Sequence, residues 1–337
     1  MEKVWQKDFG YAFFRPYIQW AVRNSYSKIT IKGPENIPNP EEVSVLIAGN
    51  HCNCLMDALV LLQARKEPTA FVARADIFKN PFIARILGNL RILPIYRQRD
   101  GADSKAKNIA VFDNVVECLE SGMAFSIFPE GTHRPHRSLL PIKKGVFRIA
   151  QQAVAANPDR KVVVVPMGLE YDDYFNIMRP VTISFGSPME IKGGESLEVL
   201  AEELKARISK LITYFPYDAD FEAKEKEFED SKKPSFGIIH WIAAALLFPF
   251  LLISGFLCSP MLIATAFFKT KIKDHAWYNT VRFGAKLALT PFTVAGAAIA
   301  GFVHLPWYLA LVFIAVTLYA HPLFYSILIF YKRLLAK

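Results

Sequence analysis

VSVLIAG at residues 43–49 runs directly into NHCNCLMD at residues 50–57. The first part is apolar and rich in β-branched residues, and it ends on glycine, which predicts a buried strand followed by a turn. In open α/β sheets, reactive groups gather where strands end and helices begin. The histidine and the carboxylate that follow this strand, His51 and Asp57, are therefore a candidate proton-transfer pair.

The position of Asp57 decides where His51 must lie. Asp57 precedes the apolar residues 58–62 and is expected to start the next helix. A helix turns about 100° per residue, so side chains six positions apart diverge by roughly 120°. His51 is therefore placed in the turn, where one imidazole nitrogen can bond to Asp57 and the other can take a proton from a hydroxyl. The alternative is a capping Asp beside an unrelated loop His.

A second polar loop, FPEGTHR at residues 128–134, also follows an apolar strand, at residues 123–127. Gly131 permits close backbone approach, Thr132 offers a hydroxyl and an amide, and Arg134 can fork onto phosphate oxygens. A helix predicted to open at Lys143, Lys144 and Gly145 would add an amino end that favours an anion. The alternative is a solvated turn with a basic surface.

A third strand could bring more positive charge to the same edge. RILPIYRQRD, at residues 91–100, has an apolar part that ends at Ile95 and Tyr96 and delivers Arg97 and Arg99 to a loop. A pair of exposed arginines is the simpler explanation, because charged residues normally lie outside.

Four motifs together resemble the glycerolipid acyltransferase family. They are NHCNCLMD, PIYR, FPEGTHR and VVVVPMGLEY (residues 162–171), and the resemblance covers roughly residues 37–186. It implies that His51 and Asp57 are catalytic, that Arg97 holds the acceptor's phosphate, that Glu130, Gly131 and Thr132 bind the acceptor, and that Pro166 has a structural or donor-site role. One departure is that five residues separate His51 from Asp57, where the commonest family pattern has four.

The resemblance implies acyl transfer from a thioester to a hydroxyl of a glycerol phosphate. The expected reaction converts 1-acylglycerol 3-phosphate (lysophosphatidate) to phosphatidate, and the alternative acceptor is glycerol 3-phosphate. The expected co-substrate is acyl-CoA or acyl carrier protein carrying the acyl chain, and no bound cofactor is expected. A membrane scaffold that keeps the fold without the chemistry is the alternative of another class.

The cysteines favour neither a thiol nucleophile nor a metal site. Cys52 and Cys54 closely follow the histidine, but immediate neighbours on an extended turn point away from each other. C-x-C beside one histidine lacks a second ligand pair at zinc spacing. With Cys118 and Cys258 in other contexts, no disulfide framework is expected, and free thiols fit a reducing cytoplasm.

Composition divides the chain into four parts. Residues 1–30 are aromatic and basic, with a stripe at Trp5, Phe9, Phe13, Tyr17 and Trp20, which favours an interfacial amphipathic helix over a core-packed one. Residues 31–217 are expected to form an α/β domain with a central sheet flanked by helices. Residues 218–235 are expected to form a charged, helix-like linker with a solvated face, and residues 236–337 an all-α hydrophobic membrane region.

The membrane region contains two apolar blocks, residues 237–268 and 287–331. The first is too short for two crossings, which need about 40 apolar residues. Positive charges flank both blocks on every side, at Lys232, Lys233, Lys269, Lys271, Lys273, Arg282, Lys286, Lys332, Arg333 and Lys337. The positive-inside rule then predicts that each block enters and returns, as a re-entrant hairpin and a deeper one, with the catalytic domain on the cytoplasmic side. The alternative is a single tilted crossing by the first block.

The formal net charge of +9 suits an anionic membrane surface and phosphate substrates. Membrane lipids are therefore expected partners. Nucleic acid is not, because no recognisable nucleic-acid-binding motif accompanies the charge.

Overall fold

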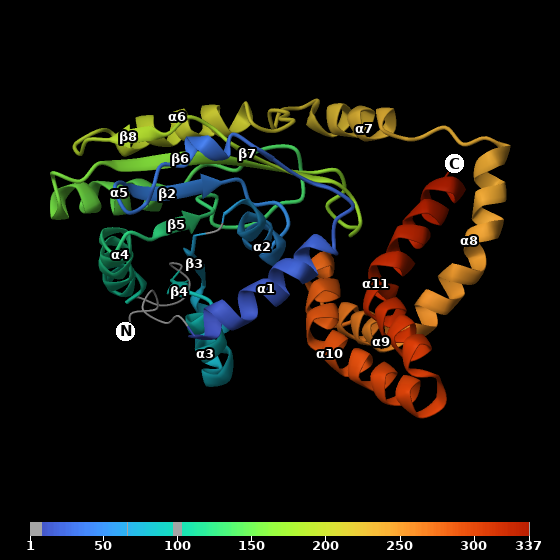
Figure 1. Cartoon of the computed structure of the whole chain (residues 1–337). Coiled ribbons are helices and arrows are strands. Elements are labelled where there is room, and N and C mark those ends of the chain that lie inside the picture. Colours follow the sequence, from blue (N-terminus) through green and yellow to red (C-terminus); the bar gives the residue numbers. More distant parts are fainter. Residues whose placement is uncertain (1–8, 66, 97–102, 337) are drawn as a thin grey trace.

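A computed structural model describes residues 9–65, 67–96 and 103–336. It consists of an α/β domain and a helical C-terminal region, as the composition predicted (Figure 1). Trp5, Arg97 and Arg99, which the sequence singled out, lie outside the described residues.

Within the described residues, eight strands form one sheet in the order β1-β7-β6-β2-β5-β3-β4, and β8 also pairs with β6. β6 is antiparallel to β7 and β8, and the other pairs are parallel. The strands are β1 (Ile29–Lys32), β2 (Ser44–Gly49), β3 (Thr69–Arg74), β4 (Ile92–Ile95), β5 (Ala124–Ile127), β6 (Val162–Tyr171), β7 (Val181–Phe185) and β8 (Met189–Ile191). β1 begins before the predicted domain boundary at residue 31, so the sheet takes in the end of the predicted amphipathic segment.

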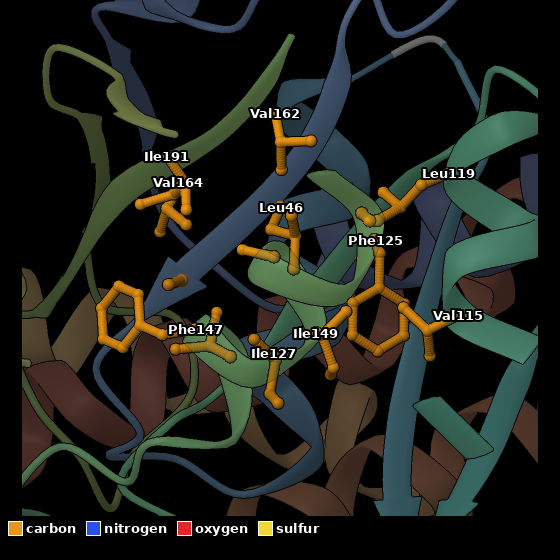
Figure 2. Packing of buried hydrophobic residues seen from close by; sticks show 14 of the residues in the cluster. Leu46, Val115, Leu119, Phe125, Ile127, Phe147, Ile149, Val162, Val164 and Ile191 are labelled. Atoms are coloured by element: carbon orange, nitrogen blue, oxygen red, sulfur yellow. The ribbon is translucent and has the colours of Figure 1, made fainter. Parts of the chain in front are cut away.

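Helices cover both faces of the sheet because the side chains of a buried strand alternate between them. Leu46 and Ala48 of β2 pack with α4 (Ser104–Glu120), α5 (Gly145–Ala156) and α6 (Leu197–Ser209). Figure 2 shows this cluster, with Leu46, Phe125 and Phe147 gathered in one group. Val45 and Ile47 face the other way, toward α1 (Phe9–Arg23) and α2 (Leu55–Ala64). The remaining short elements of the domain are η2 (Pro34–Asn36), η3 (Ala75–Lys79) and α3 (Pro81–Asn89).

The C-terminal region follows α7 (Phe221–Ser231) and consists of α8 (Ile238–Leu257), α9 (Ser259–Lys269), η5 (His275–Trp277), α10 (Tyr278–His304) and α11 (Trp307–Leu335). Among the described residues, three helical stretches are long and apolar enough to cross a membrane: 238–257, 275–304 and 307–335. α8 runs through Pro249 as one helix, and the chain turns at Cys258 into the shorter α9.

Both apolar blocks begin and end beside the α/β domain. At the start of α10, the Asn279 side chain donates to the Tyr174 carbonyl (2.8 Å). At the end of α11, Arg333 donates to the carbonyl of Lys232, just before α8 (3.4 Å). The ammonium of Lys269, at the end of α9, lies 4.6 Å from the ring centre of Tyr278. Each block therefore leaves the α/β domain and returns to it.

Two of the expected flank charges are in fact buried docking residues. Lys286 is 1% exposed, and its ammonium donates to the carbonyls of Ala21 (2.9 Å) and Asn24 (2.7 Å) at the end of α1. A cation at this position complements the negative end of the helix dipole. Arg282 is also buried and donates to the carbonyl of Phe175. These two charges attach α10 to the α/β domain and do not lie among lipid headgroups.

The N-terminal helix α1 has two different faces. Ile18, Ala21 and Val22 are buried against the sheet, so part of the helix packs in the core. Phe13 and Phe14 are 70% and 48% exposed, and they remain available for the predicted contact with an interface.

Candidate active site

The imidazole of His51 and the carboxylate of Asp57 meet at the carboxyl end of β2. His51 lies in the turn after β2, and Asp57 lies in the first turn of α2. His51 Nδ1 is 2.7 Å from Asp57 Oδ2, and the same oxygen accepts from the backbone N–H groups of Cys52 (2.9 Å) and Asn53 (2.8 Å). Asp57 is fully buried, at 0% exposed. The carboxylate is thus held by the backbone, and it can orient the ring while leaving Nε2 for proton transfer.

The unusual five-residue spacing is taken up in the turn before α2. Cys54, the residue before the helix, has a φ of 49° and a ψ of −127°. A positive φ is costly for a residue with a side chain, and such conformations concentrate at functional sites. The extra residue therefore changes the backbone of the turn and does not prevent contact between His51 and Asp57.

The neighbouring thiols are poorly suited to attack. Burial raises the pKa of the Cys52 thiol well above its usual range, and the nearby Asp57 charge raises it further. Burial likewise raises the pKa of Cys54. Both groups stay protonated near neutral pH, whereas the nucleophilic form of cysteine is the thiolate. Within the part of the chain that the structure describes, no group of three or more His, Cys, Asp or Glu side chains could hold a metal ion.

The FPEGTHR loop joins the His51 turn because β5 lies next to β2. Glu130 is 3% exposed, and its oxygens accept from the backbone N–H groups of His51 (2.8 Å) and Leu140 (2.9 Å). The Arg134 N–H donates to the His51 carbonyl (3.0 Å), and the ring of Phe128 stacks on the ring of His51 with centroids 4.6 Å apart. The two loops therefore form one site, in which Glu130 holds the backbone of His51.

Comparison with known proteins identifies this part of the molecule. Residues 28–170 match the family model described as Acyltransferase. They form an acyltransferase-family domain. A glycerol-3-phosphate O-acyltransferase of Saccharomyces cerevisiae is 37% identical over 111 residues, which are 32% of this chain and 15% of the yeast protein. A chloroplastic 1-acyl-sn-glycerol-3-phosphate acyltransferase of Arabidopsis thaliana is 29% identical over 152 residues, or 44% of this chain and 38% of that protein.

These matches span less than two thirds of the length of either relative. Among solved structures, the chain is similar to the 1-acyl-sn-glycerophosphate acyltransferase PlsC from Thermotoga maritima. That similarity has a TM-score of 0.45 and 22% sequence identity, and it covers 59% of this chain and 78% of the other.

The other residues that were predicted to bind substrate differ in their surroundings. Gly131 has a φ of 72°, a left-handed conformation that favours glycine, and Thr132 is exposed in the same loop. The guanidinium of Arg134 is turned toward the Tyr217 ring, 4.5 Å from its centre. Lys144 pairs with Glu198 of α6, whereas the side chain of Lys143 packs over Gly131. The structure thus brings Lys143, rather than Lys144, against the loop, and Arg97 stays a prediction.

The charged segment at residues 218–235 contains a helix, α7, whose residues are mostly exposed, and it also makes specific contacts with the α/β domain. Its helix α7 holds the residues that follow the FPEGTHR loop. Glu225 accepts from the backbone N–H of Arg137 (2.7 Å), and Glu229 accepts from its Nε (2.8 Å). The side chain of Arg137 is only 2% exposed, and its guanidinium is paired with Glu229 of α7 and with Glu170 of β6. The acidic residues of α7 therefore hold the segment that follows the FPEGTHR loop at the candidate active site.

Sequence reasoning assigned no role to a second histidine, His133. Its ring centre lies 5.6 Å from that of His51, and its Nε2 is 2.8 Å from Asp274 Oδ2. Asp274 comes from the C-terminal region, 141 residues further along the chain. The only hint in the sequence was the presence of a histidine inside the FPEGTHR motif. No local pattern could show that it pairs with Asp274, because the two residues are so far apart in the chain.

Proposed function

We propose that this protein transfers a fatty acyl group from a thioester to the free hydroxyl of 1-acylglycerol 3-phosphate, giving phosphatidate. The observation that carries the proposal is the 2.7 Å contact between His51 and the buried Asp57, in a turn whose backbone Glu130 holds. The relatives named for 1-acylglycerol-3-phosphate acylation support the choice of acceptor. Acyl-CoA and acyl carrier protein present the same thioester, so either is a candidate donor.

In the proposed reaction, His51 is the general base. Its Nε2 takes the proton of the acceptor hydroxyl as the oxygen attacks the thioester carbonyl carbon. The tetrahedral intermediate collapses by breaking the carbon–sulfur bond, and the leaving thiolate takes the proton back from His51. Asp57 stays ionised throughout and stabilises the transient imidazolium. No covalent acyl-enzyme is needed.

Glycerol 3-phosphate is the second candidate acceptor, because the yeast relative is named for acylating it. Both acceptors present a hydroxyl near a phosphate monoester. Arg97, Arg134, Lys143 and Lys144 are the candidate sources of positive charge for that phosphate. A scaffold without chemistry would have no use for a buried carboxylate bonded to a histidine, and it would show no turnover.

The test is an assay of the purified full chain with two acceptors and two donors. Glycerol 3-phosphate and 1-acylglycerol 3-phosphate are each combined with acyl-CoA and with acyl carrier protein bearing the same acyl chain. We expect the highest kcat/KM with 1-acylglycerol 3-phosphate, and phosphatidate as the product detected by mass spectrometry. Higher kcat/KM with glycerol 3-phosphate would favour the second candidate. No transfer in any combination would favour the scaffold.

We further propose that α8 to α11 anchor the protein in a membrane with the acyltransferase domain on the cytoplasmic side. The positively charged residues that remain exposed, such as Lys233 and Lys271, lie at the ends of the helices that adjoin the α/β domain. Under the positive-inside rule this end faces the cytoplasm.

This orientation predicts the labelling of a cysteine placed at Thr270, an exposed residue after α9. The four native cysteines are buried, so a membrane-impermeant maleimide should leave the unmodified protein unlabelled. In Thr270→Cys, we expect labelling only after cells are permeabilised. A His304→Cys variant, at the opposite end of α10, is the matched control and should label in intact cells if α10 spans the bilayer. Labelling of Thr270→Cys in intact cells would reverse the proposed orientation.

A further inference from the structure

The C-terminal region reaches the candidate active site through Asp274. This residue precedes η5, in the connection between α9 and α10. Its Oδ2 is 2.8 Å from Nε2 of His133, a side chain that is 14% exposed, and its Oδ1 accepts from the backbone N–H of Ala276 (2.9 Å). Both oxygens are therefore used, one to hold the local backbone and one to hold the histidine.

His133 is enclosed by aromatic rings on two sides. Its ring lies edge-on to Trp277, with centroids 5.9 Å apart, and edge-on to His51, with centroids 5.6 Å apart. Trp277, like Asp274, belongs to the C-terminal region. A displacement of residues 274–277 would therefore move His133, and His133 would move against the ring of His51.

The ring of His51 has three contacts that set its orientation. Asp57 bonds to Nδ1, Phe128 stacks on one face with an interplanar angle of 12°, and His133 meets the ring edge-on at 82°. Asp57 and Phe128 come from the α/β domain and need no help from the C-terminal region. His133 lies two residues after Gly131, in a loop with a left-handed backbone, and it depends on Asp274 to keep its place.

The negative charge of Asp274 suits it to hold the ring of His133. Partial burial is the largest influence and favours the neutral acid, but the hydrogen bonds from His133 and the Ala276 N–H, together with the nearby charges of His133 and His275, lower the pKa of Asp274 below its ordinary value. Asp274 is thus ionised throughout the neutral range and favours an imidazole ring that donates Nε2–H toward it. Asp274 remains about half exposed, at 53%, so the pair adds little to stability and its value lies in orientation.

We propose that Asp274 and His133 are positioning residues that orient the ring of His51, so that the C-terminal region supplies part of the active site. This inference rests on the proposed role of His51 in acyl transfer. It makes the chemistry depend on the docking of the membrane region, because a base misplaced by about 1 Å can cost up to about 100-fold in rate.

The main test is Asp274→Ser in the full-length protein. A serine here can still accept from the Ala276 N–H as a helix cap, but it is too short to reach His133. We expect kcat to fall by roughly 10- to 100-fold while KM for the acceptor stays within about two-fold. His133→Ala should lose a similar factor. The double variant should lose no more than the worse single variant, because both changes break the same contact.

His275→Ala is the matched control. His275 is the exposed neighbour of Asp274, and its ring stacks on Tyr278 with centroids 4.8 Å apart, away from His133. It should leave kcat unchanged. Wild-type kcat in Asp274→Ser, a loss confined to KM, or losses that multiply in the double variant would each overturn the inference.

A second measurement does not depend on acyl transfer. Diethyl pyrocarbonate modifies unprotonated imidazole nitrogens, and mass spectrometry locates each modified histidine. Release of Nε2 from Asp274 should raise the labelling of His133 several-fold in Asp274→Ser, and His275→Ala should not change it. Unchanged labelling would show that the pair does not form in solution. If the wild-type protein transfers no acyl group at all, the proposed function fails, and the labelling still decides whether Asp274 holds His133.

Discussion

The His51→Ala variant is expected to lose acyl transfer, with kcat/KM lower by roughly 10²- to 10⁴-fold. In the proposed reaction, Nε2 of His51 removes the proton of the acceptor hydroxyl. The adjacent His133 is a poor substitute because its Nε2 is bonded to Asp274. Initial rates with saturating donor and varied 1-acylglycerol 3-phosphate would measure the loss.

The variant should still fold. The side chain of His51 is 19% exposed, and after its removal Asp57 still accepts from the N–H groups of Cys52 and Asn53. The thermal midpoint in detergent should therefore stay close to that of the wild type. His304→Ala, at an exposed position at the end of α10, is the control for removing a histidine. Transfer at the wild-type rate in His51→Ala would eliminate the proposed base.

Asp57→Asn should lower kcat by about 10²- to 10⁴-fold while leaving the turn intact. Oδ2 of Asp57 accepts three hydrogen bonds, from His51 Nδ1 and from the backbone of Cys52 and Asn53. The asparagine oxygen can take this position and accept all three. What is lost is the negative charge that stabilises the imidazolium in a buried site. The loss should therefore fall on kcat, with KM nearly unchanged.

Comparing Asp57→Ala with Asp57→Asn separates the contribution of Asp57 to catalysis from its contribution to folding stability. It leaves the two backbone N–H groups without their acceptor in a buried turn, at a cost of about 1–3 kcal/mol for each unsatisfied group. The thermal midpoint should fall for Asp57→Ala and hold for Asp57→Asn, although both lose activity. An Asp57→Asn variant with kcat within about two-fold of wild type would contradict the proposed role of the charge.

Most strands of the sheet were predictable because their signals are local. Six apolar runs lie where β2 to β7 form, and β2 and β6 are buried along nearly their whole length. β1 was missed because it is an edge strand whose last two residues are exposed, and β8 was missed because it has only three residues. The meeting of the two loops was also predictable, since neighbouring parallel strands end at the same edge of a sheet.

The partners of the charged residues were much less predictable. Asp274 is next to His275 in the chain, but it bonds to His133, which is 141 residues away. Arg282 and Lys286 were counted as charges at the membrane surface, but both are buried against the α/β domain. A charge pattern shows which residues are polar, and only the docking of distant segments shows which of them meet.

By itself, the sequence determined most strands of the sheet, the turn that carries His51, and the two loops that belong to one site. These features depend on apolar periodicity, glycine and residues close along the chain. The tertiary structure decided that Glu130 holds the His51 backbone, that α7 fixes Arg137, and that the C-terminal region reaches His133. These contacts depend on how helices dock across long separations, where burial makes each polar group find a partner that no local pattern specifies.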